Sequence, residues 1–176
     1  MEIQIVKKEF MHREICSMCF LASFGMALRI PFYKKGINRE PIKEYFREEL
    51  WNLIDRYSSR QVEDKEHIEL IVTIKNEVNN KFSEQLSREG ITFGRAQKLI
   101  NLYLKYMWVC GYIKEPPHCP IDSQVIGKLG QEFNGVGMIS MKRKNYDRII
   151  EAIREMAGGQ SIAEWELTFF NKISKR

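Results

Sequence analysis

The stretch TFGRAQKLINLYLKYMWVCG, residues 92–111, determines the architecture expected of this chain. Its apolar residues point in nearly every direction around a helix instead of forming a single stripe. A helix of this kind must be covered by protein on most sides, so it lies in the middle of a domain. Thr92 suits the start of the helix and Gly111 suits its end. The stretch therefore predicts a central, nearly all-apolar helix with other helices packed around it.

Apolar residues recur at helical spacing in six other segments, and prolines, glycines and polar linkers separate them. The expected helices cover residues 6–29, 41–57, 64–90, 122–133, about 146–156 and 161–173. Strand signals are confined to two short pieces, Met1–Val6 and Val136–Met141. The prediction is an all-α fold, a single-domain bundle of about seven helices that spans residues 1–176.

The composition is that of an ordinary globular protein. The chain has 176 residues, 44% of them hydrophobic and 29% charged, which is enough to bury a core without disulfides or metal. Its net charge of +5 is uneven, since residues 1–88 carry 15 basic and 14 acidic residues and residues 89–176 carry 13 and 9. A basic half favours phosphate-bearing partners through counterion release, although many surfaces of this balance bind no anion. DNA is therefore one expected partner.

Other classes of protein receive little support from the sequence. No apolar run reaches the roughly 18 residues of a membrane helix, and the closest one, Ile15–Leu28, is interpreted as a core helix. Four cysteines without a regular framework suit a reducing, cytoplasmic setting. The sequence contains no Ser-His-Asp order, phosphate-binding glycine loop or paired-carboxylate metal motif, and no cofactor is expected.

The cysteines allow two interpretations. Cys16 and Cys19 have the spacing of zinc ligands, and Cys110, His118 and Cys119 could complete a tetrahedral site. However, the Cys16–Cys19 pair lies within an apolar helical pattern, where free cysteines are commonly buried. The pattern favours buried thiols, and no metal site is predicted.

A polar stripe interrupts the apolar helix at residues 92–111. At about 100° per residue, Lys98, Asn101 and Lys105 fall within a narrow arc, which Trp108 and Tyr112 flank. A buried ammonium without a partner is too costly, so this stripe must meet water, a ligand or buried partners. It is either a strip that contacts phosphates and bases, with an aromatic ring for stacking, or a row of side chains that reach the solvent.

The loop PPHCPIDSQV, residues 116–125, is the second candidate for chemistry. Three prolines stiffen it, and Asp122 is placed to cap the next helix by accepting N–H bonds. A capping carboxylate stays ionised and can still present one oxygen to a cleft. His118 can serve as an acid or base near neutral pH, or can hold the loop together by hydrogen bonds. Both roles stay open for each residue.

Taken together, Gly90-Ile-Thr-Phe-Gly94-Arg95-Ala-Gln-Lys98, the long apolar helix and Pro120-Ile-Asp122-Ser-Gln-Val125 resemble the core of the helix-hairpin-helix DNA glycosylases over about residues 86–130. The resemblance implies that a hairpin containing Gly90 and Gly94 binds DNA phosphates through backbone amides. It implies that Asp122 supports a cationic sugar in the transition state and that Lys98 attacks that sugar.

Two classes of function are expected. The first is a DNA-binding, glycosylase-like enzyme with Asp122 at the active centre, Lys98 beside it and His118 as a further catalytic candidate. The second is a non-catalytic helical module that binds nucleic acid or protein, in which Asp122 is only a cap. In the first class, the expected nucleic-acid contacts come from Gly90, Gly94, Arg95, Asn101, Lys105, Trp108 and Tyr112.

Overall fold

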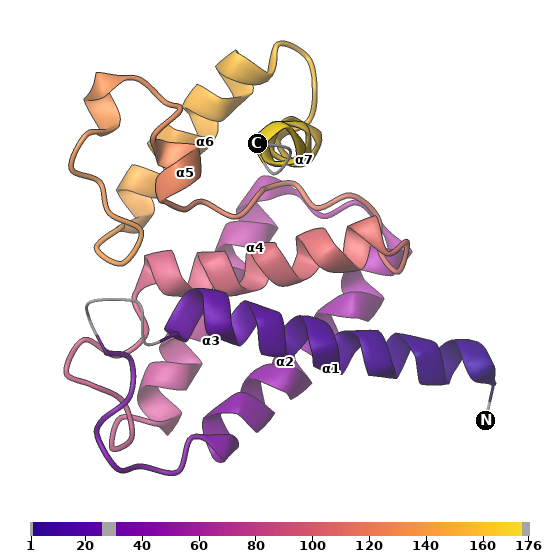
Figure 1. Ribbon diagram of the computed structural model, residues 1–176, viewed down its shortest axis with the longest axis vertical. Coiled ribbons are helices and arrows are strands. Elements are labelled where there is room, and N and C mark those ends of the chain that lie inside the picture. The colour runs from indigo at the N-terminus through magenta and orange to yellow at the C-terminus, as the bar shows by residue number, and fades with distance from the viewer. Residues whose placement is uncertain (1, 26–30, 174–176) are drawn as a thin grey trace.

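The structure, a computed structural model, describes residues 2–25 and 31–173 (Figure 1). Its regular elements are helical, and the described residues contain no strand beyond one isolated bridge between Tyr33 and Leu86. The α-helices are α1 (Ile3–Phe24), α2 (Glu40–Ser59), α3 (Asp64–Lys81), α4 (Phe93–Val109), α5 (Ser123–Ile126), α6 (Arg143–Ala157) and α7 (Ile162–Ile173), with one 3-10 helix at Gln131–Phe133. The prediction of an all-α bundle is confirmed.

Helix α4 is central, as its apolar circumference predicts. It packs against α1, α2, α3 and α6, and it runs antiparallel to α1 (Figure 1). Most of its side chains are buried, including Leu99 and Leu104, which point about 140° apart around the helix. The first turn is capped by Thr92, whose hydroxyl accepts a hydrogen bond from Arg95 N at 3.4 Å.

The chain turns back on α4 after Val109 and adds a second group of helices. In Figure 1, α5, α6 and α7 lie together on one side of α4 and α1 lies along its other side, while α3 crosses behind α4 and its first turn reaches α6. The predicted apolar stripe of α6 is buried at Tyr146, Ile149, Ile150 and Ile153. At the start of α7, Ser161 Oγ accepts a hydrogen bond from Glu164 N at 3.0 Å, as expected of a helix cap.

Two predicted helices are wrong in extent. The third was expected to reach residue 90, but α3 ends at Lys81, and residues 82–91 form turns. These turns bind the segment that comes after α1, since Ser87 N donates to Phe32 O and Lys34 N donates to Gln85 O, each at 2.9 Å. The fifth has only four α-helical residues.

The weak strand signals are also wrong. Ile3–Val6 lies in α1, because its apolar residues fit the helical repeat of residues 7–24 as well as they fit an alternating pattern. Residues 136–141 form turns, of which one is closed by the bond from Met141 N to Met138 O. The end of the first predicted helix, at residues 26–29, lies outside the described residues.

Within residues 2–25 and 31–173, no helix is both long enough and apolar enough to cross a bilayer.

Candidate functional site

Asp122 both caps helix α5 and forms an ion pair with Lys98. Its Oδ1 accepts hydrogen bonds from Gln124 N at 2.9 Å and Val125 N at 3.2 Å, which confirms the predicted cap of α5. Its Oδ2 accepts a hydrogen bond from Lys98 Nζ at 3.0 Å. Both side chains are partly exposed, Lys98 by 15% and Asp122 by 27%. The carboxylate is therefore fixed in orientation by the backbone and still reaches solvent.

Gln97 is the reason that Asp122 lies beside α4. Its side-chain amide donates to Ile121 O at 2.6 Å and accepts from Ile121 N at 3.1 Å. These two bonds hold the backbone of the residue before Asp122 against α4, one position away from Lys98. The two candidate residues, 24 positions apart in sequence, are thus brought together by a third side chain.

Lys98 and Asp122 line a pocket of about 190 Å³ between α4, the proline loop and α7. Aromatic rings of Tyr106, Phe169 and Phe170 form part of its wall. The other lining residues are Ala22, Leu102, Lys105, Pro120, Gln124, Val125 and Glu166. The pocket therefore combines apolar ring surfaces with four charged groups.

The second pair of charges in this pocket is Lys105 with Glu166. Lys105 Nζ lies 2.9 Å from Glu166 Oε1 and 2.7 Å from Oε2, and the two side chains are only 9% and 6% exposed. The ammonium also lies over the ring of Phe170, at 4.4 Å from its centroid. Burial raises the pKa of Glu166, and the hydrogen bond and charge of Lys105 oppose that rise.

Asn101 occupies a different position from the two lysines. It is fully buried. Its Nδ2 donates to Cys119 O and Tyr146 Oη, each at 2.9 Å, and to Gln97 Oε1 at 3.2 Å. Its Oδ1 accepts from His67 Nε2 at 2.7 Å. The predicted stripe on α4 is therefore divided. Lys98 and Lys105 face the pocket, and Asn101 is the centre of an interior hydrogen-bond network.

His118 belongs to that interior network. Its Nδ1 lies 2.9 Å from Tyr146 Oη, its Nε2 lies 3.2 Å from Asp64 Oδ1, and the ring has no exposed surface. The contact with His118, aided by Arg154, lowers the pKa of Asp64 to about 2. His118 does not line the pocket of Lys98 and Asp122. Of the two roles expected for it, the geometry supports the one that holds the loop together.

The hairpin residues have structural functions as well. Gly90 adopts a positive φ of 58°, and the side chain of Asn79 bonds both Ile91 N, at 2.7 Å, and Ile91 O, at 3.0 Å. At Gly94, an added Cβ would lie 1.6 Å from Met138 O, so this position admits only glycine. The backbone at both glycines is held by the protein itself.

The aromatic and cationic candidates at the two ends of α4 lie away from the pocket. Arg95 is only 1% exposed and lies 5.7 Å from the ring centroid of Phe32, and burial lowers its pKa. Neither Arg95 nor Asn101 has the access to solvent that a contact with DNA requires. Trp108 and Tyr112 are partly buried against the core and do not line the pocket.

Basic side chains do gather at a larger groove, of about 700 Å³, near the start of α4. Its floor is apolar, with Val72, Ile91 and Phe93 among its residues, and its cationic lining groups are Lys75, Lys142 and Arg143. Lys142 and Arg143 are exposed at the beginning of α6. These two cations are accessible to solvent, whereas Arg95 and Lys105 are buried.

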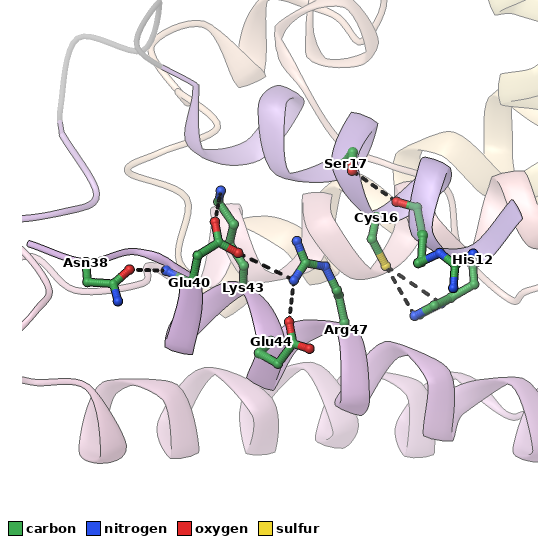
Figure 2. A network of polar contacts seen from close by, with 9 residues as sticks. His12, Cys16, Ser17, Asn38, Glu40, Lys43, Glu44 and Arg47 are labelled. Carbon is green, nitrogen blue, oxygen red and sulfur yellow. Dashed lines mark hydrogen bonds and ion pairs between the residues drawn. The ribbon is translucent and has the colours of Figure 1, made fainter. Parts of the chain in front are cut away.

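The cysteines are mostly interior thiols. Cys16 and Cys19 are fully buried on α1, as predicted, and burial raises the pKa of Cys16 to about 12. Figure 2 shows Cys16 beside the ring of His12, whose nitrogens lie 3.7 and 3.8 Å from its sulfur. Within the part of the chain that the structure describes, no group of three His, Cys, Asp or Glu side chains is arranged to hold a metal ion.

Sequence reasoning missed Glu166 and the two phenylalanines beside it. A signal was present, because Glu166 is an acidic residue on the α7 face that also carries the buried Ile162 and Ala163. A charge on an apolar face needs a partner of opposite sign. Lys105, on the equally apolar α4, is such a partner, but 61 residues separate the two.

Comparisons of the chain with protein-family models, with curated proteins and with solved structures gave no significant match. The geometry of the pocket and of the groove is therefore the basis for assigning a function.

Proposed function

We propose that this protein binds DNA and cleaves the bond between a base and its sugar, in the manner of a DNA glycosylase, with Asp122 at the active centre. One observation carries the proposal. The Asp122 carboxylate is oriented by two backbone N–H groups and by Lys98, and it lines a pocket with aromatic walls.

The pocket suits one unstacked base better than a longer ligand. Enzymes that act on a base within DNA move it out of the stack into a closely fitting pocket, where aromatic side chains cover its faces. Here Tyr106, Phe169 and Phe170 supply the rings, and the volume is about 190 Å³. The charged groups of the pocket supply donors and acceptors for the polar edge of the base.

The chemistry assigned to Asp122 is electrostatic. When the bond from C1′ of the sugar to the base nitrogen breaks, the bonding electrons leave with the base and the sugar becomes an oxocarbenium cation. A fixed carboxylate stabilises that cation, since its orientation needs no rearrangement during the reaction. Water then attacks C1′ and releases a proton.

Lys98 is assigned to positioning Asp122 and not to nucleophilic attack. Its ammonium donates a hydrogen bond to Asp122 Oδ2, and a protonated amine has no lone pair with which to attack C1′. Treatment of the reacting protein with borohydride, which traps an imine between a lysine and the sugar, is therefore expected to give no covalent complex. A trapped complex that disappears in Lys98→Ala would assign the attack to Lys98.

The groove supplies the expected contact with the DNA backbone. Lys75, Lys142 and Arg143 are cations that counterion release would favour on a phosphate surface. Phe93, in the groove, and Lys98, in the pocket, are five residues apart on α4, or about 7.5 Å along its axis. Five residues also turn the helix by about 140°, so a strand bound at the groove must pass around the side of α4 to bring a base to the pocket. Four unpaired cysteines, three of them buried, agree with a cytoplasmic location, which is part of the proposal.

The decisive experiment measures base release. Duplex and single-stranded oligonucleotides with one uracil, hypoxanthine or 7-methylguanine are incubated with the protein, and the free base is quantified by chromatography. Release by the wild type and a loss of at least about 100-fold in Asp122→Asn are expected. Asp55→Asn, at an exposed position of α2, is the matched control and should keep full activity. Activity that survives in Asp122→Asn removes Asp122 from the mechanism.

The groove also supports a second candidate, a module that binds DNA without chemistry. In either case affinity should fall steeply as salt increases, and Lys142→Ala/Arg143→Ala should weaken binding and reduce the slope of log affinity against log salt by about two. The control Lys7→Ala/Arg13→Ala removes two cations from α1, away from the groove. Binding to DNA with no release of any base would favour this second candidate, and affinity that does not respond to salt would exclude DNA in both.

A further inference from the structure

The start of helix α1 is exposed to an extent that a helix in water does not favour. Residues 2–7 are all exposed, and Figure 1 shows this end of α1 extending beyond the other helices. Glu2, the N-cap residue, makes no side-chain hydrogen bond to the helix, and the first turn contains the β-branched residues Ile3, Ile5 and Val6. Helices in proteins are stabilised mainly by packing of an apolar face. A partner for this end of α1 is therefore expected.

The outer face of α1 carries a row of exposed apolar side chains, here called the α1 stripe. At about 100° per residue, four of them lie within an arc of about 60°: Ile3, Val6, Phe10 and Leu21. Met18 borders this arc, and the five side chains are between 39% and 74% exposed. The buried residues of α1 lie on a different face. Single exposed apolar residues need no explanation, whereas a row of them marks an interaction site.

Charged residues flank the α1 stripe on both sides. Lys7 and Glu14 lie on one side, and Glu9 and Arg13 lie on the other. Within residues 2–25 and 31–173, no ion pair uses any of the four. Each side of the stripe thus carries one cation and one anion that can pair with charges of another molecule.

We infer that α1 binds α1 of a second copy of this chain, with the two helices antiparallel about a two-fold axis between Phe10 and Met11. An axis at this point places Lys7 opposite Glu14 of the second copy. Because a two-fold contact is symmetric, Glu14 also lies opposite Lys7 of the second copy. The charges on this side of the stripe are therefore complementary to themselves.

The same axis also matches the other side of the stripe and its apolar residues. Glu9 lies beside Arg13 of the second copy, and Phe10 meets its own counterpart next to the axis. At either end, Ile3 lies opposite Met18 of the second copy and within one turn of its Leu21. A parallel arrangement is disfavoured, because it brings Glu9 beside Glu14 of the second copy.

A lipid surface fits α1 less well than a second copy does. Helices that lie on membranes carry an excess of Lys and Arg, which anionic lipids attract. Residues 2–14 have no such excess, since they contain three basic and three acidic residues: Lys7, Lys8, Arg13, Glu2, Glu9 and Glu14. This balance favours a partner that carries both signs. The stripe residues line neither the pocket nor the groove, so the inference is independent of the proposed function.

Sedimentation equilibrium measures the association directly. For an interface of this small size we expect a dissociation constant of about 10 µM, and a Tm that rises with protein concentration. At the submicromolar concentrations of the DNA-binding experiment the protein is then monomeric. Phe10→Asp should weaken dimerisation at least about 100-fold, because symmetry places the change twice beside the axis. Met156→Asp, at a position of α6 that is 50% exposed, is the matched control and should leave dimerisation unchanged.

A charge exchange tests the direction and register of the two helices. Lys7→Glu and Glu14→Lys each bring like charges together at both ends of the contact, so each variant alone should dimerise at least about tenfold more weakly. An equal mixture of these two variants has opposite charges at both ends and should form a heterodimer nearly as stable as the wild-type dimer. The double variant Lys7→Glu/Glu14→Lys should recover dimerisation for the same reason.

Three outcomes would overturn the inference. The first is a wild type that stays monomeric up to about 100 µM. If that monomer also co-sediments with vesicles of phosphatidylcholine and phosphatidylserine, the stripe binds lipid instead. The second is a dimer that Phe10→Asp does not weaken, which would form through another surface. The third is a mixture of Lys7→Glu and Glu14→Lys that associates no better than either variant alone, which would exclude the antiparallel contact.

Discussion

Two neighbouring strips of the same helix differ in almost every physical respect. One strip of α4 carries Gln97 and Asn101, which are uncharged and fully buried and whose side-chain bonds go to other buried groups. The other carries Lys98 and Lys105, which are charged, paired with carboxylates and in contact with a cavity. The first strip holds the proline loop against α4 by hydrogen bonds. Asp122, at the end of that loop, is thereby placed beside Lys98 of the second strip.

The two strips lie within about two turns of one helix, and different contributions are expected of them. The neutral strip stabilises the fold, and the charged strip supplies groups to the pocket. A buried amide stabilises a fold when all its donors and acceptors have partners, as those of Asn101 do. A charge pair beside a cavity contributes less to stability, because the cost of removing it from water offsets the attraction. The strips should therefore respond to mutation in opposite ways, and four experiments test that expectation.

The largest loss of stability is expected for Asn101→Leu. The change leaves His67 Nε2 and Cys119 O without their partner in the interior, and each unsatisfied group costs roughly 1–3 kcal/mol, while Tyr146 Oη keeps its contact with His118 Nδ1. Urea denaturation should show a decrease of about 4 kcal/mol in the free energy of unfolding. Asn80→Leu, at an exposed position of α3, should change it by less than about 0.5 kcal/mol. A loss under about 1 kcal/mol at Asn101 would show that the network is not what fastens the loop.

The next effect is a contrast between single and double substitution in the charged strip. Lys105→Met leaves the Glu166 carboxylate buried and unpaired and should cost about 3 kcal/mol, whereas Lys105→Met/Glu166→Leu should cost about 1 kcal/mol or less. Lys43→Met, which breaks an exposed pair with Glu40, should stay within about 1 kcal/mol and serves as the control. If the double variant is as unstable as the single one, the pair stabilises the fold and the contrast between the strips is lost.

A third experiment tests the neutral strip through pH. Burial, followed by the charge of His118, lowers the pKa of His67 to about 3, so this ring is neutral in the folded protein. The unfolded chain takes up a proton below about pH 6.5, so stability is complete above that pH and is lost progressively as pH falls toward 3. Between pH 7 and pH 5 the contribution of His67 to this loss is about 2 kcal/mol.

The check compares the wild type with His67→Gln by thermal or urea unfolding at both pH values. The variant should be less stable at pH 7 but should lose about 2 kcal/mol less than the wild type on acidification. The remaining loss belongs partly to His12, whose pKa burial lowers to about 4. Identical pH profiles for the two proteins would mean that His67 is not held neutral.

The smallest effect is expected for Asp122→Asn. Asparagine caps a helix nearly as well as aspartate, and the partly exposed bond to Lys98 contributes little, so the loss of stability should be below about 1 kcal/mol. Asp122→Ala, which also removes the cap, should cost about 1–2 kcal/mol in the same denaturation experiment. Equal losses in the two variants would show that the cap has no part in stability, and that Asp122 lies there for the pocket alone.

The sequence predicted what depends on local spacing. The central position of α4 followed from its apolar circumference, the Asp122 cap from its place before Ser123-Gln124-Val125, and the candidacy of Lys98 from the polar arc. The end of α3 was not predictable in this way, because apolar residues continue at helical spacing beyond Lys81. The bonds that hold the turns after α3 come from residues 32–34, a segment distant in sequence.

Burial of polar groups was the other limit. A cationic Arg95 and a polar Asn101 look like surface residues, because charge and polarity usually mean exposure. Their interior places depend on partners from other helices and loops, such as Phe32 for Arg95 and His67 and Tyr146 for Asn101. For the same reason the ion pair of Glu166 with Lys105 could not be predicted from the sequence, because it depends on how α7 packs against α4.

Gly94 bears on the variation that the fold can tolerate. Any side chain there would collide with Met138 O, and the amide of Gln97, one turn later, matches both backbone groups of Ile121. Neither contact depends on the side chain of the opposite residue, so no substitution at Met138 or Ile121 can compensate for a change at Gly94 or Gln97. These two positions are therefore expected to be nearly invariant among proteins that share this fold.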